Sequence, residues 1–265
     1  MEEDMKTQFM PGQSITLTTR ILSVITALTA LLCTIQPSPA SGSTSAGEAF
    51  GPACGMATID GRVDTQEWQG ASSETFQMIT GSTADLLTAT LYVMNSGSYL
   101  YLGITINDDE FSEQGKWLPG GDTFRIDFDN DHSGSLFALR DDVLGVSAGW
   151  PYFEDSHIVT VSSASSDADI KYGGRPNGDG ASGRAGELNH FELMHPLCSG
   201  DELDFCLHPG DLVGFRLEYL DGEGPDVFNG SHFFPDREDT SIADIVIAPC
   251  SNISDNYVLL PFINR

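Results

Sequence analysis

The chain has 265 residues, of which 39 are acidic and 12 basic, and its formal net charge is −27 at pH 7. So negative a surface repels nucleic acid and anionic membranes, which excludes both classes of partner. The many carboxylates suit either a salty habitat or bound divalent cations.

The first 40 residues have the pattern of a secretion signal. Residues 21–35 read ILSVITALTALLCTI, with Lys6 and Arg20 before this apolar run and small residues at Ser38 and Ala40 after it. The run is shorter than the roughly 20 residues that a spanning helix needs, so a retained membrane anchor is the less favoured alternative. We expect the signal to be cleaved and the protein to be secreted, periplasmic or at the cell surface, without stable membrane insertion.

Loss of the signal removes Cys33 and leaves Cys54, Cys198, Cys206 and Cys250. An even number of cysteines in an exported chain indicates two disulfides, although four cysteines allow three pairings. We favour Cys198 with Cys206, which flank the turn SGDEL, and Cys54 with Cys250, which would tie the two ends of the domain together. Free buried thiols are the alternative.

The remaining sequence has the alternating pattern of β-strands. Residues 87–95 (LTATLYVMN) and 98–108 (SYLYLGITIND) predict a hairpin around Asn95 and Gly97, and similar runs recur between Gly, Asp, Asn and Pro clusters. This spacing is typical of a two-sheet antiparallel β-sandwich. The glycine-rich segment Tyr172–Gly186 is predicted to be a long mobile loop. The expected organisation is a signal peptide (1–40), a flexible arm (41–53), one β-sandwich domain (54–250) and a C-terminal tail (251–265).

Four segments in order carry a family resemblance. They are IDGRVDTQEWQGA (59–71), LYLGITINDDEF (100–111), GDTFRIDFDNDHSG (121–134) and the long closing segment from His190 to Gly222. Together they resemble the family 9 carbohydrate-binding modules and the related DOMON-like sandwiches.

The resemblance implies a jelly-roll or DOMON-like all-β fold that binds a polysaccharide or oligosaccharide without catalysis and carries calcium. It also implies that such a module aids polysaccharide breakdown, with a glycoside hydrolase or a cell-surface protein as partner. In the opening segment, we expect Trp68 to fill one end of the core and Asp60 and Gly61 to form a turn.

The stretch DFDNDHSGS (127–135) is the candidate calcium site. Asp129, Asp131 and Ser133 have the alternating spacing of calcium loops, and the following glycine permits the tight bend. The twelfth position from Asp129 is Arg140, so the full helix-loop-helix ligand set is absent. Further ligands would come from Asp127, Asp141, Asp142 or backbone carbonyls. A hydrated turn is the alternative.

Sugar binding needs aromatic faces that stack on sugar rings. The candidates outside the expected core are Trp117, Trp150, Tyr152 and Phe153, with Tyr172 beside the glycine-rich segment. The resemblance implies that two indoles, Trp117 and Trp150, could clamp a terminal sugar. Coverage of the core edge is the alternative role for either residue.

No catalytic residue is predicted. GVSAG (145–149) matches the nucleophile-elbow pattern around Ser147, but no helical pattern follows it. His190 and His195 are five apart on an expected strand, so they point to opposite faces and cannot chelate one metal.

Two rival functions remain open. DOMON-like relatives include b-type haem domains, in which a Met with a His or Lys holds the iron, and Met194 or His195 would be the ligand here. The other rival is a structural module for adhesion at the cell surface.

Overall fold

The computed structural model describes residues 49–80, 86–113, 121–149, 152–161, 165–222, 231–236 and 242–250. The chain divides into two compact units, and all of these residues belong to the one that spans Gly42–Arg265. The predicted signal and C-terminal tail lie outside the described residues. Within the described ranges, no helix has the length and apolar character required to cross a membrane.

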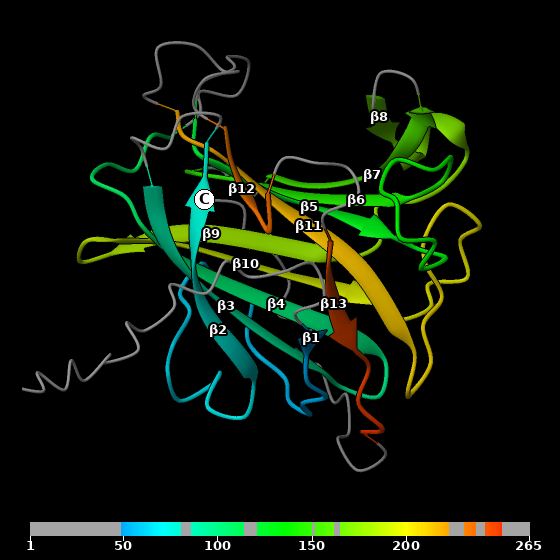
Figure 1. Ribbon diagram of the computed structural model, residues 1–265, viewed down its shortest axis with the longest axis horizontal. Helices are drawn as coiled ribbons and strands as arrows, with labels where there is room; N and C mark the ends of the chain where they lie inside the picture. The colour runs from blue at the N-terminus through cyan, green and yellow to red at the C-terminus, as the bar shows by residue number, and fades with distance from the viewer. Residues whose placement is uncertain are drawn as a thin grey trace, which may run out of the picture. The chain divides into compact units, whose positions relative to one another are not determined.

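The described residues form thirteen strands and one short 3-10 helix, η2 (Asp169–Tyr172), which confirms the predicted all-β class (Figure 1). The strands are β1 (Ala49–Phe50), β2 (Ser72–Ile79), β3 (Leu86–Asn95), β4 (Tyr99–Asn107), β5 (Thr123–Asp129), β6 (Asp142–Ser147), β7 (Tyr152–Thr160), β8 (Ser165–Ala168), β9 (Asp179–Ala185), β10 (Leu188–Pro196), β11 (Leu212–Leu220), β12 (Ser231–Phe234) and β13 (Ala243–Val246).

The strands form a sandwich of two layers. The first layer has the order β8-β7-β6-β5-β11-β12, with β13 also pairing with β11 and β1 with β13, and the second has the order β2-β3-β4-β10-β9. The layers share a hydrogen-bonded network because Phe233 of β12 pairs with Ile79 of β2. Two separate sheets were predicted from the strand spacing, whereas this edge pair makes the network continuous. The predicted hairpin is confirmed as β3 and β4, whose pairing runs from Thr88–Asn107 to Asn95–Leu100.

The main core fills the space between the layers. Alternate residues of β5 point into it, namely Phe124, Ile126 and Phe128, and alternate residues of β4 such as Leu102 and Ile104 do the same from the second layer. All five are fully buried. Burial of one such side chain contributes about 1.5–3 kcal/mol, so this core is the main source of stability.

Trp68 packs on the outer face of the second layer, away from the main core. Its indole lies with Met94 and Tyr101 in a separate cluster, and it is 2% exposed. Gly103 of β4 makes room for the ring, because a Cβ atom there would lie 2.8 Å from the indole. The prediction that Trp68 is buried is confirmed, but it covers a sheet face and does not fill the end of the main core.

Two segments differ from the sequence prediction. Ala49 and Phe50, expected in a flexible arm, form β1, because Phe50 is buried against Phe215. The second half of the predicted mobile loop forms β9. Its Gly180 fits against β6, where a Cβ atom would approach Val146 Cγ2 to 2.5 Å, so this glycine serves close packing.

Both favoured disulfides are present. Cys54–Cys250 has a Cα–Cα distance of 5.5 Å and joins residues near the two ends of the described domain. Cys198–Cys206, with 4.1 Å between Cα atoms, closes the short turn after β10. The second disulfide fixes the loop between residues 198 and 206, which lines a surface pocket.

Candidate functional site

A surface pocket of about 520 Å³ is formed by three segments of the chain. One is the end of η2 with the loop that follows, the second is the turn closed by Cys198–Cys206, and the third contributes Arg140. The lining residues are Arg140, Tyr172, Gly173, Gly174, Arg175, Asn177, Ser199, Gly200, Asp201, Glu202 and Leu203. One aromatic ring is therefore surrounded by amide, hydroxyl, carboxylate and guanidinium groups.

Tyr172 is the sequence-predicted aromatic that this pocket contains. Its side chain is 55% exposed, and its ring makes a T-shaped contact with His157 at 5.0 Å between centroids. His157 in turn shares a hydrogen bond of 2.7 Å with the Asp169 carboxylate at the start of η2. His157 thus supports one side of the Tyr172 ring, while about half of the Tyr172 side chain is exposed to solvent.

Asn177 connects the pocket with the interior. Its backbone N–H donates to Asp155 Oδ2, and its side-chain Nδ2 donates to Asp204 Oδ2 at 2.9 Å. Both carboxylates belong to a group that we call the buried cluster, made of Asp142, Asp155, His195 and Asp204.

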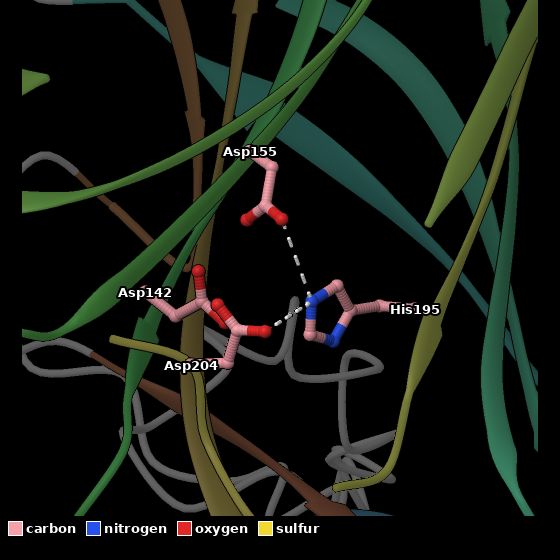
Figure 2. Close-up of side chains that lie close together, drawn as sticks. All are labelled: Asp142, Asp155, His195 and Asp204. Carbon is pink, nitrogen blue, oxygen red and sulfur yellow. Dashed lines mark ion pairs between the residues drawn. The ribbon is translucent and has the colours of Figure 1, made fainter. Parts of the chain in front are cut away.

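Figure 2 shows the carboxylates of Asp155 and Asp204 facing one nitrogen of His195, with Asp142 beside Asp204. His195 Nε2 lies 3.6 Å from Asp204 Oδ2 and 3.9 Å from Asp155 Oδ2. Asp142 and Asp155 come from β6 and β7 of the first layer, His195 from β10 of the second, and Asp204 from the disulfide-closed turn. The side chains of His195, Asp155 and Asp204 are all fully buried in these pairs.

Burial changes the acidity of these carboxyl groups. It raises the pKa of Asp142 well above its ordinary value, and the charges of Asp155 and Asp204 add to the rise. Burial likewise raises the pKa of Asp155 to about 8, against the hydrogen bond from the Asn177 amide. Burial would also raise the pKa of Asp204, but its neighbours, chiefly His195, outweigh it, so that this pKa lies below its ordinary value. Three carboxylates at one buried point repel one another, and a positive charge among them relieves the repulsion.

The predicted calcium loop is partly assembled. Asp129 and Asp131 lie together with Asp141, with ligand oxygens within 4.8 Å of one another; we call this the loop group. Ser133 donates to Asp129 Oδ1 through both its N–H (2.9 Å) and its Oγ (3.1 Å). The Asp129 carboxylate thus also stabilises the turn itself, as in the hydrated-turn alternative.

Two aspartates considered for the calcium loop lie elsewhere. Asp127 Oδ1 is 2.7 Å from Arg125 Nη2, and its Oδ2 is 3.0 Å from Arg216 Nη2. Two guanidinium groups occupy this carboxylate, so the prediction that Asp127 binds the metal is corrected. Asp142 is a member of the buried cluster.

A third acidic group joins Asp108, Asp122 and Asp221. In the sequence, the acidic stretches 107–110 and 221–226 are explained by turns, and nothing shows that they meet Asp122, because the three members come from separate segments. Burial raises the pKa of Asp122 to about 6, and Tyr219 donates a hydrogen bond to Asp108 Oδ2 at 2.5 Å. A pocket of about 580 Å³ beside this group is lined by described residues that include acids and Arg184 but no aromatic ring.

The structure places the backbone of Tyr152, a further predicted aromatic. Trp117 and Trp150 lie outside the residues that the structure describes. Tyr152 begins β7, five residues before His157, and this spacing corresponds to about 17 Å along a strand. The backbone of Tyr152 therefore lies well away from His157, the β7 residue that Tyr172 contacts.

Met194 and His195 do not fit the haem alternative. They are neighbours in β10, so their side chains lie on opposite faces of the strand. Met194 packs in the Trp68 cluster, and His195 faces three carboxylates. An imidazole with three carboxylates is a donor set for a bare cation, so we derive no haem chemistry from it.

The remaining catalytic motifs have structural roles. Ser147 ends β6 and pairs with Tyr152 of β7, so the GVSAG motif leads into a strand where an elbow requires a helix. His190 Nδ1 accepts a hydrogen bond of 3.1 Å from the Val63 amide, on the face of β10 opposite His195. The prediction that the two histidines cannot chelate one metal is confirmed.

No protein-family model and no curated protein matches the chain. Solved structures do match it. One is a family 9 carbohydrate-binding module (CBM9) from Caldicellulosiruptor kristjanssonii in complex with cellotriose, with a TM-score of 0.52 and 16% identity over 82% of this chain and 97% of that one. The chain has a CBM9-like fold.

A second CBM9 structure from the same organism, in complex with glucose, gives a TM-score of 0.52 and 15% identity. It covers 80% of this chain and 99% of its own. The likeness thus extends over the whole CBM9 domain and confirms the fold that the four sequence segments predicted.

Proposed function

We propose that the protein is a non-catalytic carbohydrate-binding module that binds an oligosaccharide or polysaccharide in the Tyr172 pocket. The observation that carries the proposal is a half-exposed aromatic ring, braced by His157, among side chains that donate and accept hydrogen bonds. Aromatic faces stack on the apolar faces of sugar rings, and the polar groups hold the hydroxyls. The CBM9-like fold, whose solved examples were obtained with cellotriose and glucose, supports the same class of ligand.

A glycan array followed by calorimetric titration of the best oligosaccharide tests this proposal. Tyr172→Ala removes the stacking ring and is expected to weaken affinity at least tenfold, about 1.4 kcal/mol. Tyr172→Phe keeps the ring and should retain most of the affinity. Ile170→Ala is the matched control, since Ile170 is 67% exposed on the same η2 helix but does not line the pocket. A Tyr172→Ala variant that binds as tightly as the wild type would refute this assignment of the site.

We further propose that the loop group binds calcium. Three carboxylates with oxygens within 4.8 Å of one another, in a loop with calcium-type spacing, support this. Calcium titrated into chelated protein should raise the melting temperature, and Asp131→Asn should abolish that rise because it removes a carboxylate from the loop group. Glu187→Gln removes an exposed charge elsewhere and should leave the rise intact. A melting temperature that calcium does not change would make the stretch a hydrated turn.

The proposed setting is outside the cytoplasm. Two disulfides support export, since disulfides persist mainly in oxidising compartments. We propose that the signal over residues 1–40 is removed and that the module then assists polysaccharide breakdown beside a glycoside hydrolase or on a cell-surface protein. A purely adhesive module is the rival, and it predicts no binding to any isolated glycan on the array.

A further inference from the structure

The buried cluster differs from an ordinary acidic surface patch because its members are shielded from water. Asp142 and His195 are 0% exposed, and Asp155 is 4% exposed. Charged groups placed so deep are stable only when they are paired or hold a metal. Among the described residues, the ion pairs of these four side chains are those of His195 with Asp155 and Asp204, and no Lys or Arg joins them.

Six polar atoms of the cluster have no hydrogen-bond partner among the described residues, although Asn177 donates to Oδ2 of Asp155 and of Asp204. Among the residues that the structure describes, no hydrogen bond of normal geometry reaches either carboxylate oxygen of Asp142 or either ring nitrogen of His195. Asp155 Oδ1 and Asp204 Oδ1 likewise have no hydrogen-bond partner there. A neutral imidazole always has one N–H to donate and one nitrogen to accept, so His195 leaves both capacities unused among the described residues.

The distances fit donors that share one ion. Separations of 3.6 and 3.9 Å from His195 Nε2 to Asp204 and Asp155 are too long for hydrogen bonds. Donors bound at about 2.0–2.2 Å around a tetrahedral ion lie about 3.4 Å apart, a figure that follows from the bond length. One oxygen or nitrogen from each of the four residues lies within 4.8 Å of the others, so a small movement would complete the coordination.

The donor set selects the class of ion. Calcium and magnesium prefer oxygen ligands alone, whereas imidazole suits Zn²⁺ and related first-row transition metals, and carboxylates suit Mn²⁺. One imidazole with three carboxylates combines a nitrogen donor with enough negative charge for a divalent ion. The loop group, in contrast, offers oxygen ligands alone.

The supports of the cluster are themselves rigid. Asn177 donates to Asp155 and Asp204, and the Cys198–Cys206 disulfide closes the turn that carries Asp204. Phe205 contacts the His195 ring at 4.7 Å between centroids. Such contacts fix the orientation of the donors before any ion arrives.

We propose that the buried cluster binds one divalent first-row transition-metal ion, of the Mn²⁺ or Zn²⁺ class, through His195 Nε2 and its three carboxylates. The ion would lie between the two layers, below the floor of the Tyr172 pocket, and would join β6, β7, β10 and the disulfide-closed turn. This site is separate from the calcium proposed for the loop group and does not depend on glycan binding.

The test uses the full chain, stripped with a chelator and loaded with Mn²⁺. Pulsed electron paramagnetic resonance should show coupling of the bound Mn²⁺ to an imidazole nitrogen. His195→Gln should abolish the coupling, and Asp142→Asn, which keeps side-chain shape, should weaken Mn²⁺ affinity at least tenfold in calorimetry. Zn²⁺ should compete for the site, and Ca²⁺ should not.

His132→Gln is the matched control. His132 lies next to Asp131 in the loop and shares a hydrogen bond of 3.0 Å with Asp244, so it is the histidine that a surface-bound Mn²⁺ would reach there. The nitrogen coupling should persist in this variant. Mn²⁺ that shows no nitrogen coupling in the wild type, a coupling lost in His132→Gln, or displacement of Mn²⁺ by equimolar Ca²⁺ would overturn the proposal. If either cluster variant does not fold, as judged by circular dichroism, the wild type and His132→Gln still decide between these results.

Discussion

At the residue scale, Glu192 explains why the opening segment adopts its conformation. Its Oε2 accepts the backbone N–H groups of Asp60, Gly61 and Arg62 at 2.9–3.1 Å, and its Oε1 accepts Trp68 Nε1 at 3.0 Å. One carboxylate on β10 therefore holds both the turn and the indole on the outer face of the second layer. Gly61 is required there, because it has φ +85° and a Cβ atom would lie 2.4 Å from the Ser182 carbonyl.

Glu192 makes stability depend on pH. Burial raises its pKa above the ordinary value of 4.5, against the hydrogen bonds from Trp68 and the three amides. The folded protein therefore holds the proton at a higher pH than the unfolded chain does. The resulting contribution to stability is complete below pH 4.5 and is lost as pH rises through the folded pKa.

Glu192→Gln should remove this contribution to the pH dependence. Urea unfolding of the wild type and the variant at several pH values above 4.5 measures the free energy of unfolding of each. As pH rises, the wild type should lose stability relative to the variant, because only the wild type carries the Glu192 carboxyl. A difference that stays constant with pH would show that Glu192 has the same pKa in both states.

The acidic residues of the candidate metal sites were predicted only where they are close in sequence. Asp129, Asp131 and Ser133 lie within five residues, so their spacing shows that they converge. Asp155 and Asp204 were missed, because their meeting with His195 depends on the register of β6 with β7 and on the packing of β10 across the core. An acidic residue at a core-facing position of a strand, as Asp155 is, was the available signal.

At the element scale, local turns were predicted and close packing was not. The β3–β4 hairpin follows from alternation around a short turn. β9 was mistaken for a loop, because glycine usually marks flexible segments and here it permits a strand to lie against β6 and the 59–61 turn. Gly183 of β9 lies against the 59–61 turn, since a Cβ atom at Gly183 would approach Gly61 O to 2.7 Å.

Gly180→Ala should destabilise the protein by about 1–3 kcal/mol, because the new methyl group would clash with Val146 and Phe153. Gly51→Ala is the control, since a Cβ atom at Gly51 meets nothing within 4 Å. Denaturant unfolding compares the two. Equal stability of both variants would contradict the close approach of β9 to β6.

At the scale of the whole molecule, the sandwich class follows from strand number and spacing, and the likeness to CBM9 structures confirms it. The continuity of the layers through Phe233 and Ile79 could not be predicted, because one residue pair leaves no pattern in the sequence. The place of the Tyr172 pocket could not be predicted either. It arises where η2 and the disulfide-closed turn come together over the buried cluster.

We propose the Tyr172 pocket as the place where glycan binds. Amide hydrogen exchange, measured by mass spectrometry with and without a saturating oligosaccharide from the array, tests its position directly. We predict protection in residues 172–177 and 199–203, which line the Tyr172 pocket. Protection confined to other segments, such as residues 107–109 and 184–187 beside the third acidic group, would contradict the assignment.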